Sequence, residues 1–322
     1  MMMMSDPARR RELLLQSYGL LQALAVLAVL VVVMSILSPR FLSWINISNL
    51  MGQMAVNLIV AAGMTIVMIS GEFDISVGSV VALAAAVSAA LMQQMGVVPA
   101  VLLSLLIGPA IGFFNGVITT KGRIPSFIVT LGTLMMARSL AFVVTGGQVI
   151  SNLPEEFKAI GQGRLFNVPI PFLIALLCFA VGWFVLARTA FGKRVYAVGA
   201  NRMVATLSGI HADRVKIQCM MIVGFTAAFA GNILLARIGA IQADTARGLE
   251  FEVIAAVVIG GTSLYGGQGN ILRTIIGVII IALIRNFLNL SRIDIFWQDF
   301  ATGAIIIAAV LLDALQKRVG QR

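Results

Sequence analysis

Hydrophobic residues occur along this chain in long runs that are separated by short polar segments. A helix that spans a bilayer needs about 20 mostly apolar residues. The pattern predicts ten spans, at residues 20–38, 49–70, 78–95, 98–119, 124–144, 168–187, 216–238, 250–264, 270–290 and 297–315. The predicted fold class is therefore all-α: a polytopic helical membrane protein with a single transmembrane domain over residues 1–322.

Two glycine-rich polar segments interrupt this pattern. The stretch GMTIVMISGEFDISVGS, residues 63–79, places Glu72 and Asp74 between two apolar runs, and GGTSLYGGQG, residues 260–269, follows a short eighth span. Irregular backbone at membrane depth is tolerated only where it is buried in protein or lines a watery cavity. Discontinuous helices of this kind often form transport sites. We therefore expect broken or re-entrant helices near 71–78 and 260–269, two segments that align loosely with Gly71 over Gly261.

Composition supports the membrane assignment. Hydrophobic residues make up 60% of the 322 positions, and the mean hydropathy is +1.01. Soluble domains are closer to about 45–50% apolar, and no polar stretch is long enough for a separate catalytic domain. Cys178 and Cys219 lie in or beside apolar runs, so we expect small hydrophobic side chains rather than a disulfide. The first apolar run has no small-residue cleavage pattern after it, which favours a retained span.

The net charge of +10 comes from Lys and Arg residues that lie mostly between the spans. Ten spans place four basic segments on one side of the membrane: the N-terminal segment 1–19, the loop after span four, the loop 188–216 and the C-terminus. Basic residues concentrate on the cytoplasmic side. The sequence therefore predicts that both termini are cytoplasmic and that 188–216 is the longest cytoplasmic connection.

The loop 188–216 contains the pattern of a short helix. Asn201 suits a helix N-cap, and Gly209 suits the left-handed position that ends a helix. Such a helix either docks against a partner or lies in the membrane interface, and both interpretations stay open on these residues alone.

Asp74 is the sharpest candidate for a functional residue, because acidic residues inside membranes are usually functional. Two alternatives stay open. Ser76 and Ser79 could cap the following helix, with Asp74 adding negative charge near its positive end. Alternatively, the break could lie at the cytoplasmic surface, where Glu72 and Asp74 would simply meet water. Polar residues in apolar spans often only hold helices together. The candidates for a solute pathway are Asn57, Asp74, Ser76, Ser79, Asn115, Ser126, Thr130, Thr262 and Ser263.

Several other residues have less specific interpretations. The four-residue spacing of Gly108, Gly112 and Gly116 predicts close helix packing. Arg138 and Arg285 are expected to extend toward the membrane interface. Glu250 and Glu252 are expected to pair with Arg247 just before span eight.

Nothing in the sequence indicates an enzyme. The segment FGKR at 191–194 lacks the upstream glycine and the hydroxyl of a phosphate-binding loop. His211 is the only histidine and has no metal-ligand pattern around it. We expect no cofactor in this chain, so ATP and Mg²⁺, if transport uses them, bind to another subunit.

Five stretches resemble the membrane permease subunit of bacterial ABC sugar importers of the ribose, xylose and arabinose group. They follow the family order across nearly the whole chain: GMTIVMISGEFDISVGS, FFNGVITTKGRIPSFIVTLGTLMMARSLA (113–141), TAFGKRVYAVGANRMVATLSGI (189–210), LEFEVIAAVVIGGTSLYGGQGN (249–270) and FWQDFATGAIIIAAVLLD (296–313). The wider set includes branched-chain amino-acid permeases.

The resemblance implies a multi-pass subunit of the bacterial inner membrane that works as a permease dimer, or with a homologous permease. It also implies a separate cytoplasmic ATP-binding subunit and a periplasmic sugar-binding protein. The residues that would couple to the ATPase are Gly199, Asn201, Ala205, Leu207, Ser208 and Gly209.

The chain departs from the family pattern at a few positions. Glu72 stands where a glycine is usual, Ile75 where a leucine is usual, and Arg273 and Phe287 where glycines are usual. The coupling segment has Met203–Thr206 in place of a Glu-Ala-Ala-Arg-like run.

We therefore expect the permease subunit of an ATP-driven importer for a small sugar, a pentose or a related monosaccharide or polyol. The alternative is a self-sufficient secondary transporter or channel for a small polar solute. That class typically has several membrane-embedded acids chained for ion coupling, and the sequence offers one acidic break.

Overall fold

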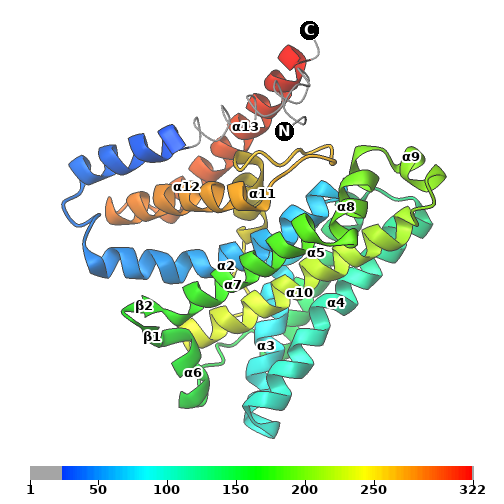
Figure 1. The fold of residues 1–322 in the computed structure, drawn as a ribbon. Helices are drawn as coiled ribbons and strands as arrows, with labels where there is room; N and C mark the ends of the chain where they lie inside the picture. Colours follow the sequence, from blue (N-terminus) through cyan, green and yellow to red (C-terminus); the bar gives the residue numbers. More distant parts are fainter. Residues whose placement is uncertain (1–23, 321–322) are drawn as a thin grey trace.

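The computed structural model describes residues 24–320 and is almost wholly helical (Figure 1). A helix lies in each of the ten expected spans, although positions 20–23 of the first span and the segment 1–19 are outside the described residues. The elements are the helix Leu24–Leu37, α2 (Trp44–Ile69), α3 (Val77–Met95), α4 (Val97–Gly122), α5 (Ser126–Thr145), α6 (Glu155–Gln162), β1 (Arg164–Leu165), β2 (Val168–Pro169), α7 (Ile170–Arg188), α8 (Ala190–Ala200), α9 (Arg202–Leu207), α10 (Ala212–Ile238), α11 (Leu249–Ile259), α12 (Ile271–Leu290) and α13 (Ile295–Gly320). The two strands form an antiparallel hairpin that pairs Arg164 with Pro169.

Seven of the described helices are long and apolar enough to cross a membrane: α2, α3, α4, α5, α7, α10 and α12. The chain is thus a polytopic helical membrane protein, as predicted. The helix α11 has 11 residues. At about 1.5 Å per residue it covers about half of the ~30 Å hydrocarbon layer.

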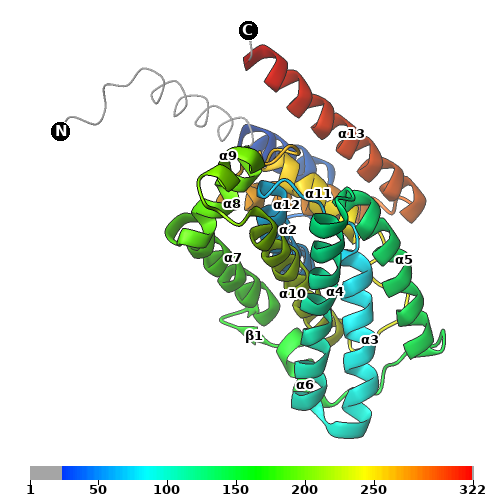
Figure 2. The same ribbon diagram turned by 90° about the vertical axis from the view of Figure 1, so that its right-hand side faces the viewer.

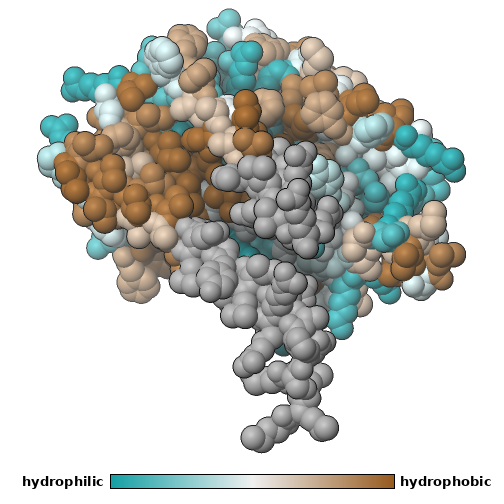
Figure 3. Space-filling view, turned by 90° about the horizontal axis from the view of Figure 1, so that it is seen from above, coloured by the Kyte–Doolittle hydropathy of each residue, from teal (hydrophilic) through white to brown (hydrophobic). Residues whose placement is uncertain are grey.

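The core is built around α2, which is apolar on all sides and almost wholly buried. A helix with this character belongs inside a bundle. By contrast, less than a third of the residues in the apolar stretches of α4, α5 and α7 are buried, as expected of helices that face lipid. The broad hydrophobic area on the left of Figure 3 lies over the helix Leu24–Leu37, where Val29, Val32 and Ile36 are exposed.

The predicted close packing at the α4 glycines is confirmed. A Cβ on Gly108 would lie 2.0 Å from the Gly224 carbonyl oxygen of α10, and one on Gly112 would lie 2.2 Å from the Met220 carbonyl oxygen. Because only glycine lets two backbones approach this closely, these positions hold α4 directly against α10.

The elements outside the spans gather at the two ends of the bundle (Figure 2). α8 and α9 lie at one end, which we call the α9 end, together with the C-terminal end of α13. α6 and β1 lie at the opposite end, the α6 end. Hydrophilic side chains gather toward the right of Figure 3, the side that carries the α9 end in Figure 1.

The helices break at both expected places, between α2 and α3 and between α11 and α12. The two helix ends also share their backbone geometry. The bonds from Ser70 N to Ile66 O, Gly71 N to Met68 O and Glu72 N to Val67 O recur at an offset of 190 positions, from Gly260 N to Ala256 O, Gly261 N to Val258 O and Thr262 N to Val257 O. The φ angles of Gly71 and Gly261 are 83° and 85°. The loose sequence alignment therefore corresponds to the same helix-ending geometry at both sites.

A third non-helical segment, residues 239–248, joins α10 to α11, and the ten predicted spans with cytoplasmic termini would make it a loop on the outer side. It begins at the α6 end, where Ile241 forms a β-bridge with Ile150. It then runs into the bundle until the Ala246 carbonyl lies against Gly78 in the first turn of α3. Short α11 leaves part of the membrane depth to be crossed by this segment, which is the physical reason for the difference.

Candidate functional site

Three segments meet at the α9 end: the connection 70–76, helix α8 and the connection 260–269. The Gly267 N–H donates to the Ile69 carbonyl at 2.8 Å. Gly199 lies between them, since a Cβ there would be 1.8 Å from the Ile69 oxygen and 2.6 Å from the Gly267 nitrogen. We call the contact of Gly71, Gly199, Gly266 and Gly267 the glycine junction.

The glycine junction depends on two properties of glycine: the missing side chain, which allows close backbone contact, and the freedom to adopt a positive φ angle. Gly71, Gly266 and Gly267 have positive φ angles of 83°, 82° and 73°, a conformation that L-residues with side chains rarely adopt. Tyr196 of α8 fastens the junction from outside, because its hydroxyl donates to the Gly269 carbonyl at 2.9 Å. Burial raises the pKa of this hydroxyl, so it stays a donor at neutral pH.

Asp74 holds the turn that leads into α3. Its Oδ1 accepts from the Ser76 N–H at 2.8 Å and from the Ser76 hydroxyl at 2.5 Å, while the side chain is 1% exposed. Ser76 itself makes no side-chain cap bond, and the Ser79 hydroxyl donates to the Ser76 carbonyl. The prediction that Ser76 and Ser79 cap the helix is therefore wrong, and Asp74 instead binds the backbone and hydroxyl of Ser76 just before α3.

Four predicted or neighbouring polar residues hold the connection 70–76 from α4 and α5. Ser126 accepts from the Phe73 N–H at 3.0 Å, and Thr130 accepts from the Ile75 N–H at 3.2 Å. In α4, Asn115 donates to the Ser76 hydroxyl at 3.4 Å and accepts from Thr133 at 2.6 Å. These side chains satisfy backbone groups of a non-helical segment, which is the condition for such a segment inside a membrane protein.

The other predicted pathway residues lie elsewhere. Asn57 donates to Glu252 of α11 at 3.1 Å. Thr262 and Ser263 lie in the connection 260–269, where the Ser263 hydroxyl accepts from the Tyr265 N–H at 3.1 Å. The structure thus joins Asp74, Ser76, Ser79, Asn115, Ser126 and Thr130 in one polar cluster, apart from Asn57. Their role in a pathway stays a prediction.

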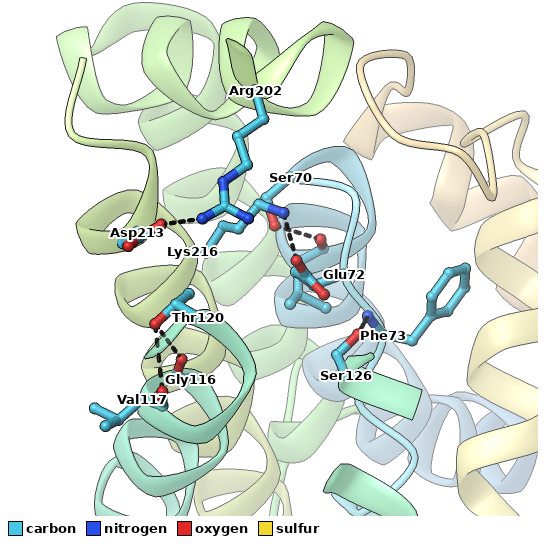
Figure 4. Close-up of polar contacts among 11 residues, drawn as sticks. Ser70, Glu72, Phe73, Gly116, Val117, Thr120, Ser126, Arg202, Asp213 and Lys216 are labelled. Atoms are coloured by element: carbon cyan, nitrogen blue, oxygen red, sulfur yellow. Dashed lines mark hydrogen bonds and ion pairs between the residues drawn. The ribbon is translucent and has the colours of Figure 1, made fainter. Parts of the chain in front are cut away.

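Glu72 has a partner that the sequence did not indicate. Lys216 of α10 reaches it with Nζ 2.5 Å from Oε1, and both side chains are largely buried (Figure 4). One turn earlier on α10, Asp213 pairs with Arg202 of α9 at 2.7 Å. These two ion pairs run from α9 through α10 to the connection 70–76. Glu72 is therefore not open to water as one alternative suggested.

The short helix of the loop 188–216 is confirmed as α9. Asn201 accepts from the Val204 N–H at 3.1 Å as its N-cap, and Gly209 has a φ of 82° just after its end. Ala205 faces the interior at 3% exposure, while Leu207 is 83% exposed. Met203 and Val204 are exposed as well, so the outer face of α9 is apolar.

The charged residues of α5, α11 and α12 make other contacts than those predicted. Arg138 does not extend to the interface, because its guanidinium donates to the Ala243 and Thr245 carbonyls at 2.7 and 2.8 Å. Glu252 pairs with Arg285 rather than with Arg247. Arg247 instead lies 3.6 Å from Asp244.

Within residues 24–320, no three His, Cys, Asp or Glu side chains gather as a metal site requires. The site offers backbone contacts, ion pairs and an exposed apolar helix face.

Known proteins resemble the chain over nearly all its length. The family model described as the branched-chain amino acid transport system permease component matches residues 46–310. The ribose import permease protein RbsC of Bacillus subtilis (strain 168) is 41% identical over 291 residues, covering 89% of this chain and 90% of that protein.

Two further relatives cover similar shares. The ribose import permease protein RbsC of Escherichia coli (strain K12) is 38% identical over 297 residues, 91% of this chain and 92% of that protein. The autoinducer 2 import system permease protein LsrC of Yersinia pseudotuberculosis serotype O:1b (strain IP 31758) is 36% identical over 293 residues, 90% of this chain and 83% of that protein. No solved structure matches the chain.

Proposed function

Because the chain belongs to the family of permease components of branched-chain amino acid transport systems, we propose that it is the membrane subunit of an ATP-driven importer for a small sugar. Ribose or a close relative is the proposed solute. The observation that carries this proposal is the similarity to ribose import permeases at 38–41% identity over about nine-tenths of the chain. The similarity to an autoinducer 2 import permease, at 36% identity, makes autoinducer 2 the second candidate solute.

We place the α9 end in the cytoplasm and the α6 end outside. Support comes from the basic residues Lys193, Arg194, Arg202, Arg214 and Lys216 in and around α8, α9 and the start of α10, since basic residues favour the cytoplasmic side. This orientation puts the C-terminal end of α13 inside as well.

The ATP-binding subunit is a separate chain in this proposal and holds ATP and Mg²⁺. Its docking surface on the permease is the exposed face of α9, formed by Met203, Val204 and Leu207. An apolar helix face of this kind fits into a groove on a partner. Movement of α9 reaches the span connection 70–76 through the glycine junction and the two ion pairs.

The remaining partners are a sugar-binding protein, which docks at the α6 end, and a second permease copy or a homologous permease. The assembly lies in the bacterial inner membrane. A self-sufficient secondary transporter is the alternative. It would need no ATPase, and the apolar face of α9 would then lie in the membrane interface.

The test is transport by the purified assembly. The tagged chain is purified from its own membranes with its bound subunits, placed in liposomes with ATP inside, and supplied with the sugar-binding protein and radiolabelled D-ribose. We expect uptake that needs both ATP and the binding protein, with competition by related pentoses. Uptake driven by an ion gradient without ATP, or no co-purifying ATPase, would overturn the proposal.

A further inference from the structure

The segment 239–248 runs part of the way through the membrane-spanning region without forming a helix. Ile241 lies at the α6 end beside Ile150. A Cβ on Gly78, the second residue of α3, would lie 2.7 Å from the Ala246 carbonyl oxygen. Arg138, in the middle of α5, donates to two carbonyls between these points. The segment therefore follows α5 through the region that the spans occupy (yellow trace beside α5 in Figure 2).

This segment turns rather than running as extended chain: the Thr245 N–H donates to the Gln242 carbonyl at 2.9 Å, and Ala246 has a φ of 60°. Its side chains still divide into a buried and an exposed set. Ile241 and Ala243 are buried, whereas Gln242 and Asp244 are exposed. Arg247 is exposed on the next turn of the chain. The side chains of Asp244 and Arg247 are 48% and 79% exposed. The result is a polar stripe, Gln242, Asp244 and Arg247, on the open side of the segment.

Lipid is not a possible neighbour for this polar stripe. Non-helical backbone at membrane depth is tolerated only where it is covered by protein or lines water. A charged pair inside a membrane likewise faces the interior of an assembly or a hydrated cavity. Exposed lipid-facing positions elsewhere in the chain, such as Leu177 in α7, are apolar. The open side of 239–248 is thus different in kind from the lipid-facing surface.

The back of the segment is held by fixed charges. Arg138 satisfies the Ala243 and Thr245 carbonyls, and the nearby Glu250 carboxylate attracts the Arg138 guanidinium. Oε2 of Glu250 is buried against Gly78 and accepts no hydrogen bond from any described residue. Asp244 also attracts the Arg138 guanidinium, yet the side chains of Asp244 and Arg247 remain exposed on the open side of the segment.

We propose that Gln242, Asp244 and Arg247 form a monosaccharide contact site on the wall of the transport passage. This inference rests on the proposed sugar-import function. Sugar hydroxyls both donate and accept hydrogen bonds. The stripe offers a pure acceptor in Asp244, a pure donor in Arg247 and both kinds of group in Gln242. The opposite charges of Asp244 and Arg247 balance, which favours a neutral solute over an ion.

The contact between Asp244 and Arg247 is loose. At 3.6 Å it is longer than a normal hydrogen bond. Both groups therefore keep hydrogen-bonding capacity for a passing hydroxyl group. A weak, exchangeable site suits a passage, because a solute that binds tightly there would not leave.

The first experiment tests whether water reaches the polar stripe. In the full importer with Cys178→Ala and Cys219→Ala, we introduce Gln242→Cys or Arg247→Cys, with Leu177→Cys as the lipid-facing control. A charged, membrane-impermeant maleimide reacts with thiolates, which form in water. We expect labelling at 242 and 247 to be at least about tenfold faster than at 177. Equal, slow labelling at all three positions would overturn the proposal.

The second experiment tests sugar contact in the reconstituted importer. Asp244→Asn and Arg247→Gln are compared with Arg40→Gln, an exposed arginine in the connection before α2. We expect D-ribose uptake per ATP hydrolysed to fall about tenfold in the first two variants and to stay normal in the third. Binding-protein-stimulated ATP hydrolysis should remain within about twofold, because the coupling surface is untouched.

The outcomes separate the two proposals. If the unsubstituted importer takes up no ribose, the proposed function fails. If it takes up ribose and both stripe variants match it in uptake per ATP, the stripe does not contact sugar. A loss of ATP hydrolysis in proportion to uptake would show that the stripe is only structural, and this result would also overturn the inference.

Discussion

Lys216 of α10 and Glu72 of the connection 70–76 form a largely buried ion pair, with side-chain exposures of 12% and 10%. The two residues are 144 positions apart in sequence, and the pair ties the end of α2 to the start of α10. Asp213, one turn earlier on α10, extends the link to Arg202 of α9. Glu72, beside the break between α2 and α3, is therefore linked through α10 to α9, the helix with the exposed apolar face.

Removing one partner of this pair should destabilise the protein. Lys216→Met leaves Glu72 buried without its counter-charge, and a broken buried pair costs about 3–5 kcal/mol. We expect a clearly lower thermal unfolding midpoint in detergent. The charge-reversed double variant, Glu72→Lys with Lys216→Glu, should recover part of the loss. Arg202→Gln is the matched control, since its more exposed pair is worth about 0–1 kcal/mol. Equal effects of Lys216→Met and Arg202→Gln would contradict this view.

Gly199→Ala should be the most damaging glycine substitution at the α9 end. The added Cβ would meet backbone atoms of Ile69 and Gly267, which cannot move independently. We expect a cost near the upper end of the about 1–3 kcal/mol typical of overpacking. The measurement is the thermal unfolding midpoint.

Alanine substitutions at two other glycines serve as controls for the loss of stability in Gly199→Ala. Gly209 has a positive φ but open space around it, so Gly209→Ala should cost about 1 kcal/mol. Gly132 lies in α5 with nothing near its Cβ position and should tolerate alanine without loss. The order Gly199, Gly209, Gly132 is the expectation, and any other order would show that the close approach at Gly199 is not what matters.

Substitutions on the exposed and buried sides of α9 should have different effects, on ATPase binding and on thermal stability respectively. Leu207→Asp changes the exposed face and should release the ATPase from the purified assembly while the thermal midpoint stays within about a degree or two. Ala205→Trp forces a large side chain into the buried side and should lower the midpoint itself. Pull-down of the ATPase and thermal unfolding, measured on both variants, separate the two effects. ATPase retention by Leu207→Asp would place the docking surface elsewhere.

The proposed orientation predicts a cytoplasmic C-terminus. A reporter enzyme that works only in the periplasm, fused after Arg322, should be inactive, and a reporter that works only in the cytoplasm should be active. The same pair of reporters inserted after Gly147, at the α6 end, should give the opposite result. Activity of the periplasmic reporter at Arg322 would reverse the assignment of both ends.

The sequence was sufficient for features that depend on local pattern. Apolar runs located the helices, because a spanning helix must be apolar over its length. Glycine and polar residues located both helix breaks, and Asn201 and Gly209 marked the ends of α9 by their capping chemistry.

The sequence was not sufficient for contacts between distant segments. Glu72 could not be paired with Lys216, because a single sequence carries no signal for which basic residue a buried acid will meet. The same holds for Arg138 and the two carbonyls that it binds. The path of 239–248 was missed because its polar residues resemble an ordinary loop, although the shortness of the eighth apolar run was a usable clue.

The glycine junction also sets an order of events during biosynthesis. Gly199 emerges from the ribosome before Gly267, yet the two must touch for α8 to settle against Ile69. Chains fold largely from the N-terminus as they are made. Until the segment after α11 has been inserted, α8, which leads into α9, lacks the packing contact with Gly267. A chain truncated before residue 260 would therefore insert its early spans without α8 and α9 in their final positions.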